Sequence, residues 1–160
     1  MKTSLFNDTI ENIRAAAVII RDGGLVAFPT ETVYGLGADA LNSEAVSKVY
    51  AAKGRPSDNP MIVHIAETSE LAKLTNDINS DMRALMDAFW PGPMTMIVRR
   101  KDVVPDVTTG GLDTVGVRLP SSEVARTLIR ESGCPIAAPS ANISGRPSPT
   151  TVSYTHLRAH

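Results

Sequence analysis

Short apolar runs alternate along this chain with stretches whose apolar residues recur at helical spacing. The short runs span residues 25–28, 61–65, 94–98, 114–119 and 135–138. Runs of this length, bounded by turn-forming or polar residues, are typical of buried strands, and the stretches between them are long enough for helices. No repeat, linker or low-complexity segment interrupts the alternation. The pattern therefore predicts one α/β layered domain, with a sheet flanked by helices.

Each predicted helix begins after a residue whose side chain can accept hydrogen bonds from the first turn. Asp8 or Thr9 is the predicted cap of the first helix, which ends at Gly23-Gly24. The predicted caps of the later helices are Ser43, Thr68, Ser80 and either Ser121 or Ser122.

Helical spacing also predicts which side chains are buried. In the first helix these are Ile10, Ile13, Ala17 and Ile20. In the second helix Val46, Val49 and Tyr50 share one face. Residues 29–37 and 103–112 have the composition of loops. Ligands usually lie beyond strand ends in such sheets, so the polar loops are the first place to look for a site.

The charge balance argues against a general nucleic-acid-binding surface. The chain has 16 basic and 17 acidic side chains, for a formal net charge of −1, whereas such surfaces are strongly basic. Its one cysteine, Cys134, fits a reducing compartment and begins an apolar run, which predicts a buried small residue. Residues 1–10 lack an apolar stretch after a charged start, so we expect a cytoplasmic location without a membrane span.

The loop of residues 29–37 (PTETVYGLG) follows the first predicted strand. It offers the hydroxyls of Thr30 and Thr32 and the carboxylate of Glu31. Gly35 and Gly37 would let the backbone approach a ligand closely. The same composition also suits a tight solvated connection.

Two cations flank a glycine in residues 53–60 (KGRPSDNP). Arg55 could grip a phosphate with a bidentate fork and Lys53 could act as a point charge. Both could equally complement the dipole at the end of a helix. The surrounding residues do not form a Walker A loop.

Two charged or titratable side chains lie inside predicted strands. His64 is the polar exception in an apolar run, which mildly favours a functional role over a structural one. Arg118 lies within residues 115–120 (VGVRLP), where burial is costly unless a carboxylate pairs with it. That carboxylate could belong to the protein or to a substrate.

The last apolar run leads into residues 138–150 (APSANISGRPSPT), which are dense in hydroxyl and amide groups. Ser140 lacks the Gly-x-Ser-x-Gly context of a nucleophile elbow. Hydrogen bonding to a ligand is therefore the simpler role for this loop.

Taken in order, these loops and residues 89–95 (FWPGPMT) resemble the YrdC/TsaC family of threonylcarbamoyl-AMP synthases. The resemblance runs from about residue 23 to residue 151, and the ordered set is far more specific than any one motif. It implies a strongly twisted mixed sheet with helices on its faces, around a concave basic cleft.

The resemblance also implies a reaction. Members of the family condense L-threonine, bicarbonate and ATP into threonylcarbamoyl-adenylate, with release of pyrophosphate. A transferase complex then modifies tRNA with the threonylcarbamoyl group. Mg²⁺ is expected to accompany the triphosphate, without a metal site made by the protein.

Site residues follow from the matched motifs. The family's lysine-x-arginine pair corresponds to Lys53 and Arg55, which are the predicted catalytic cations. The predicted ATP ligands are Arg55, Asn59, Thr114, Asn142 and Thr150. The predicted threonine ligands are Thr32, His64, Arg118 and Ser140. No residue is assigned as the general base, although His64 is a candidate.

The resemblance predicts that residues 1–151 form a YrdC-like domain that is incomplete at its C-terminus. Residues 152–160, which include His156 and His160, are predicted to be a non-native or disordered tail rather than a metal site. We therefore expect weak stability and little or no activity from this chain.

Three alternatives remain open at this stage. The chain could be a double-stranded RNA-binding or ribosome-maturation module, which its charge and few aromatic residues disfavour. It could be a YciO-like or hydrogenase-maturation relative with a different adenylating substrate. It could also be an inactive fragment of the synthase.

Overall fold

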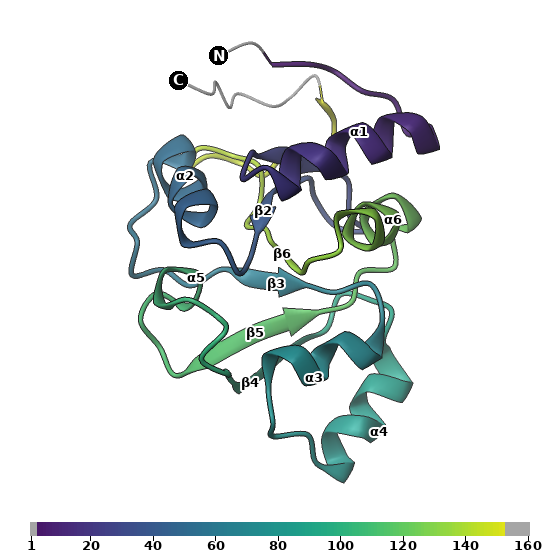
Figure 1. The fold of residues 1–160 in the computed structure, drawn as a ribbon, viewed down its shortest axis with the longest axis vertical. Coiled ribbons are helices and arrows are strands. Elements are labelled where there is room, and N and C mark those ends of the chain that lie inside the picture. Colours follow the sequence, from purple (N-terminus) through teal and green to yellow (C-terminus); the bar gives the residue numbers. More distant parts are fainter. Residues whose placement is uncertain (1–2, 153–160) are drawn as a thin grey trace.

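The computed structural model describes residues 3–152, and its centre is a mixed sheet (Figure 1). The sheet has 6 strands in the order β1-β2-β6-β3-β5-β4. β3 and β5 are parallel, and the other neighbouring pairs are antiparallel. The strands are β1 Val26–Phe28, β2 Gly35–Asp39, β3 Ile62–His64, β4 Thr95–Arg99, β5 Thr114–Arg118 and β6 Ile136–Ala137. This mixed sheet flanked by helices confirms the predicted fold class.

Except for α5, the helices occupy the segments in which the sequence predicted them. They are α1 Ile10–Arg21, α2 Ser43–Lys53, η1 Thr68–Glu70, α3 Leu71–Leu74, α4 Ser80–Phe89, α5 Asp106–Thr109 and α6 Glu123–Ser132. Within residues 3–152, no helix is both long enough and apolar enough to cross a membrane. The predicted tail, with His156 and His160, lies outside the described residues except for Val152.

The predicted caps are correct for α1 and α6 but one residue late for α2 and α4. Thr9 accepts from Asn12 N and Ser122 accepts from Ala125 N. At α2 the cap is Asn42, and at α4 it is Asn79. Each of these asparagines has an amide oxygen that reaches the first-turn N–H groups, so the serine that follows becomes the first helical residue. Ile10 is 39% exposed, so the prediction that it is buried is wrong.

Both predicted loops contain regular structure. The second half of residues 29–37 begins β2, whose glycines hide the apolar alternation of a strand. A Cβ on Gly37 would lie 2.6 Å from the Phe28 ring and 2.6 Å from the Ile136 side chain. Gly37 is therefore needed for close packing against β1 and β6. Residues 103–112 contain the short helix α5.

Helices cover the two faces of the sheet unequally. One face carries the larger core, in which side chains from the sheet pack against α2, α3 and α4. On the other face α1 and α6 lie side by side (Figure 1) and cover Phe28 and Ile136. Farther along this second face, Ile62 is 36% and Ile97 74% exposed, and both are register partners of Gly116. The second face is thus covered at β1 and β6 and exposed around Ile62 and Ile97.

Strand pairing brings the polar loops together beside the ends of β3 and β5. The parallel strands β3 and β5 end at His64 and Arg118, which are register partners. An isolated bridge joins Gly35 to Ser140. Tyr34 N donates to Pro149 O at 2.9 Å, which ties residues 139–150 to the start of β2. Loops far apart in the sequence therefore meet beside His64.

Candidate functional site

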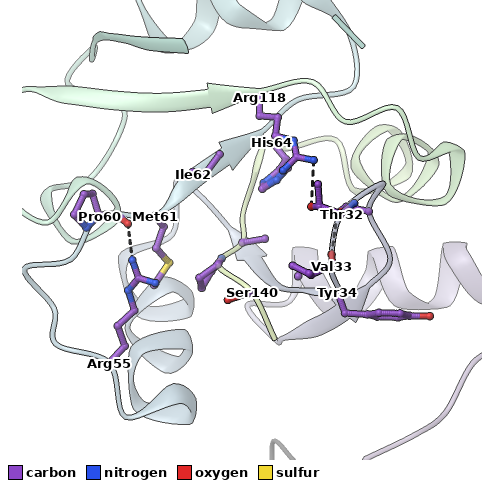
Figure 2. Close-up of a pocket in the computed structure, with 14 residues that line it drawn as sticks. Thr32, Val33, Tyr34, Arg55, Pro60, Met61, Ile62, His64, Arg118 and Ser140 are labelled. Atoms are coloured by element: carbon purple, nitrogen blue, oxygen red, sulfur yellow. Dashed lines mark hydrogen bonds between the residues drawn. The ribbon is translucent and has the colours of Figure 1, made fainter. Parts of the chain in front are cut away.

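A pocket of about 280 Å³ lies where these loops converge (Figure 2). Thr30 and residues 32–35 form one wall, and Arg55 with residues 60–62 forms another. His64 and Arg118 close the strand ends, and residues 138–140 complete the lining. Of the predicted site residues, the structure thus brings together Thr32, Arg55, His64, Arg118 and Ser140. No carboxylate lines this pocket, so its polar groups suit an anionic or hydroxyl-bearing ligand.

Arg118 is held at the end of β5 with only 8% of its surface exposed. Its Nη2 forms an ion pair with Glu31 and also donates to Thr32 Oγ1 at 3.4 Å. Its Nε is buried and has no hydrogen-bond partner among residues 3–152. Burial lowers the pKa of Arg118. The side chain nevertheless stays charged, because a guanidinium does not lose its proton in proteins. The structure therefore leaves donor capacity on a buried cation that lines the pocket.

Glu31 is the carboxylate that the sequence left unassigned. One oxygen pairs with Arg118, and the other accepts from Ser121 N at 3.2 Å. The Glu31 side chain is 19% exposed and lies outside the pocket lining. The cost of burying Arg118, together with a single acid in the polar loop of residues 29–37, was the signal that could have found this pair.

His64 is almost completely buried against the covered face of the sheet. Its ring meets Phe28 edge to face, with centroids 6.2 Å apart and planes at 88°. Burial lowers the pKa of His64 to about 4, so the imidazole is neutral near pH 7. Its Nδ1 has no hydrogen-bond partner within residues 3–152. A neutral, buried imidazole beside Arg118 can bind a polar ligand group but carries no charge of its own.

Lys53 lies behind the pocket rather than in its lining. The side chain is buried, with 1% of the residue exposed. Its Nζ donates to the backbone oxygens of Ser140 and Asn142, the latter at 2.6 Å. In return Ser144 N donates to Lys53 O at 3.0 Å. Lys53 therefore fastens the loop that carries Ser140.

Arg55 follows Gly54 in the chain and, unlike Lys53, lines the pocket. Its Nε donates to Asn59 O at 3.3 Å and its Nη2 to Pro60 O at 2.9 Å, as Figure 2 shows for Pro60. In the part of the chain that the structure describes, Arg55 forms no ion pair with a carboxylate. Backbone oxygens hold the guanidinium in place without cancelling its charge.

The remaining predicted ligands lie near the pocket or away from it. Asn59 and Thr150 are exposed and adjoin residues that shape the pocket wall. The Asn142 amide donates to Ile143 O and Arg146 O, so it organises its own loop. Thr114 pairs with Arg99 at the opposite end of β5 from Arg118. Among residues 3–152 no group of three or more histidine, cysteine or acidic side chains is arranged to hold a metal ion.

Known proteins with similar sequences cover most of this chain. The family model Sua5_yciO_yrdC (Telomere recombination) matches residues 18–158. The threonylcarbamoyl-AMP synthase of Pyrococcus abyssi is 57% identical over 142 residues, covering 89% of this chain and 42% of that protein. The Bacillus subtilis synthase is 55% identical over 143 residues, with coverages of 89% and 41%.

A solved structure also has a similar fold. The crystal structure of P. abyssi Sua5 complexed with L-threonine matches with a TM-score of 0.90 at 55% identity, covering 92% of this chain and 43% of that one. This chain spans less than half the length of these relatives.

Proposed function

The chain belongs to the Sua5/YciO/YrdC family, and from that membership we propose that it forms the substrate-binding domain of a threonylcarbamoyl-AMP synthase. The observation that carries the proposal is the convergence of Thr32, His64, Arg118 and Ser140 on the pocket that also contains Arg55. The substrates would be L-threonine, bicarbonate and ATP, and the products threonylcarbamoyl-AMP and pyrophosphate.

The proposed reaction has two steps. The threonine amine attacks the bicarbonate carbon, and loss of water gives a carbamate. A carbamate oxygen then attacks the α-phosphorus of ATP, and pyrophosphate leaves with the electrons of the broken bond. Because the reactants are anionic or carry a carboxylate, the protein must compensate their mutual repulsion and hold them in line.

The threonine end of the site is proposed at Arg118. Arg118 lines the pocket from a buried strand end, and its guanidinium, whose Nε has no partner within residues 3–152, suits a carboxylate. Thr32 and Ser140 offer hydroxyls, and the neutral His64 imidazole offers a further polar contact. The L-threonine in the matched P. abyssi structure supports this choice of ligand.

The ATP end is proposed at Arg55. Its charge is not cancelled by an ion pair, which suits phosphate oxygens. Asn59, Asn142 and Thr150 lie on the adjoining loops and are kept as proposed ATP ligands. Thr114 is kept as well, although it is remote from Arg118. For Lys53 the contacts favour an indirect role, since its ammonium donates to the backbone oxygens of Ser140 and Asn142 and so holds the Ser140 loop.

Mg²⁺ would arrive with the triphosphate, because the pocket lining offers hydroxyls but no carboxylate to hold it. The activated threonylcarbamoyl group would pass to a transferase complex that acts on tRNA.

Isothermal titration of L-threonine and ATP, separately and together, tests the proposal. We expect each to bind and the presence of one to change the heat of the other. Arg118→Ala should weaken threonine binding at least tenfold and ATP binding much less, since a charged hydrogen bond contributes about 1.5–3 kcal/mol.

A second assay follows labelled bicarbonate into an adenylate that requires both L-threonine and ATP. Binding without turnover would indicate a domain that is inactive on its own. Salt-dependent RNA binding with no affinity for threonine or ATP would overturn the proposal in favour of an RNA-binding module.

A further inference from the structure

The two arginines that line the pocket differ in their electrostatic surroundings. Arg118 forms an ion pair with Glu31, and the two side chains are only 10% and 19% exposed. Arg55 is held by the backbone oxygens of Asn59 and Pro60 and forms no ion pair within residues 3–152. One end of the pocket therefore has a cancelled positive charge, and the other end keeps its charge.

This difference matters because every proposed substrate carries negative charge. ATP and bicarbonate are net anions, whereas threonine is a zwitterion whose ammonium group accompanies its carboxylate. An unpaired guanidinium would attract all three. A guanidinium whose charge is cancelled by a nearby carboxylate still offers its N–H donors, but it attracts a net anion only weakly.

Glu31 is built into the fold as a fixed negative charge. Its second oxygen accepts from Ser121 N at 3.2 Å, just before α6. Ser122 Oγ also donates to Pro29 O at 3.1 Å, so two bonds join this loop to the start of α6. The carboxylate therefore holds the Nη2 side of Arg118 from outside the pocket, while Nε stays without a partner.

We propose that Glu31 is a specificity-determining residue that cancels the charge of Arg118, so that this end of the pocket accepts a zwitterionic amino acid and rejects simple carboxylate anions. The inference rests on the proposed threonine site. Glu31 does not contact the reacting atoms. It acts through its ion pair with the Arg118 guanidinium and through the electrostatic field of its carboxylate. Arg55, which lacks such a partner, remains available to phosphate.

The test compares L-threonine with (R)-3-hydroxybutyrate, which keeps the carboxylate, the hydroxyl and the methyl group but lacks the ammonium. For the wild-type chain, titration should show at least a tenfold preference for threonine. In Glu31→Gln the hydroxybutyrate should bind about tenfold more tightly, while threonine affinity changes by less than threefold. Glu31→Asp, which retains the charge, should keep the wild-type preference.

The matched control is Glu44→Gln, because Glu44 is an exposed acid in the first turn of α2 whose removal changes the net charge equally. It should leave both affinities unchanged. A purely structural role for Glu31 would weaken both ligands together, and that result would overturn the inference. Equal binding of the two ligands to wild type would overturn it even if Glu31→Gln failed to fold. If threonine does not bind wild type at all, the proposed function fails instead.

Discussion

Lys53 and Arg55 stand two residues apart in the chain, yet they occupy different regions of the molecule. Lys53 ends α2 and points inward, where its Nζ donates to Ser140 O and Asn142 O. Gly54 then adopts a left-handed conformation with φ 60° and turns the chain, so that Arg55 reaches the pocket. A lysine-x-arginine motif that resembles a pair of phosphate ligands thus contains one buried cation that holds a loop and one cation that lines the pocket.

The largest effect should come from the buried member of the pair. Lys53→Met leaves the Ser140 and Asn142 carbonyls without their donor, and each unsatisfied acceptor costs about 1–3 kcal/mol. Because burial of an ammonium group is relieved at the same time, we expect a net loss of about 2–4 kcal/mol in the free energy of unfolding. Urea denaturation measures it. A stable Lys53→Met protein with only ATP binding impaired would mean that Lys53 acts directly on phosphate.

Arg55→Gln should give the opposite result. The arginine donates only to backbone oxygens of its own loop, so the free energy of unfolding should change by less than about 0.5 kcal/mol. ATP affinity should fall about tenfold or more through loss of a charged contact, and threonine affinity should stay within a factor of about three. Paired titrations measure both. A matching loss of threonine binding would show that the two ends of the pocket are not independent.

The pH dependence of the free energy of unfolding should report the burial of Lys53. Burial, assisted by the charge of Arg55, lowers the pKa of Lys53 from 10.5 to about 8. Between these values the unfolded chain binds a proton that the folded chain does not. The free energy of unfolding of wild type should therefore rise relative to Lys53→Met as pH goes from 8 to 10.5.

Over the whole window the rise should be about 3 kcal/mol, because a tenfold change in proton affinity corresponds to about 1.4 kcal/mol. Denaturation curves at pH 7.5, 9 and 10 would measure it. Burial also raises the pKa of Cys134 to about 12, but this group is present in both proteins and cancels in the difference. Parallel stability curves would contradict the assigned cause.

The smallest effect should come from Lys48, which lies on the same helix. Its Nζ donates to Gly23 O at 3.0 Å and pairs with Glu44 at 3.7 Å, but its side chain is 49% exposed. Exposed pairs of this kind contribute about 0.3–0.5 kcal/mol. Lys48→Met should therefore cost less than about 1 kcal/mol in the same denaturation assay. A cost equal to that of Lys53→Met would indicate a general effect of removing a lysine from α2.

The sequence predicted the elements well because their signals are local. Alternation of apolar runs located most of the strands, and Thr9 and Ser122 cap helices as expected. β2 was missed because Gly35 and Gly37 carry no side chain to mark a buried strand. Only the packing of β2 against β1 and β6 makes it one.

The candidate site was predictable in its members but not in its pairings. The cost of burying Arg118 indicated a carboxylate partner, but that cost alone did not distinguish Glu31 from a substrate carboxylate. The burial of Lys53 could have been found. It follows Val46, Val49 and Tyr50 on the same face of α2 at helical spacing. Thr114 could not be judged without the register, which puts it at the far end of β5.

The missing side chain at Gly37 has an effect well beyond β2. Because nothing projects from that position, the Phe28 ring rests directly on the neighbouring backbone and still meets the His64 imidazole at its edge. Even one methyl group there would overlap the ring, and any shift of the ring would be transmitted to the imidazole. The position of the His64 imidazole in the pocket wall therefore depends on the absence of a side chain at Gly37, with which it has no ring contact of its own.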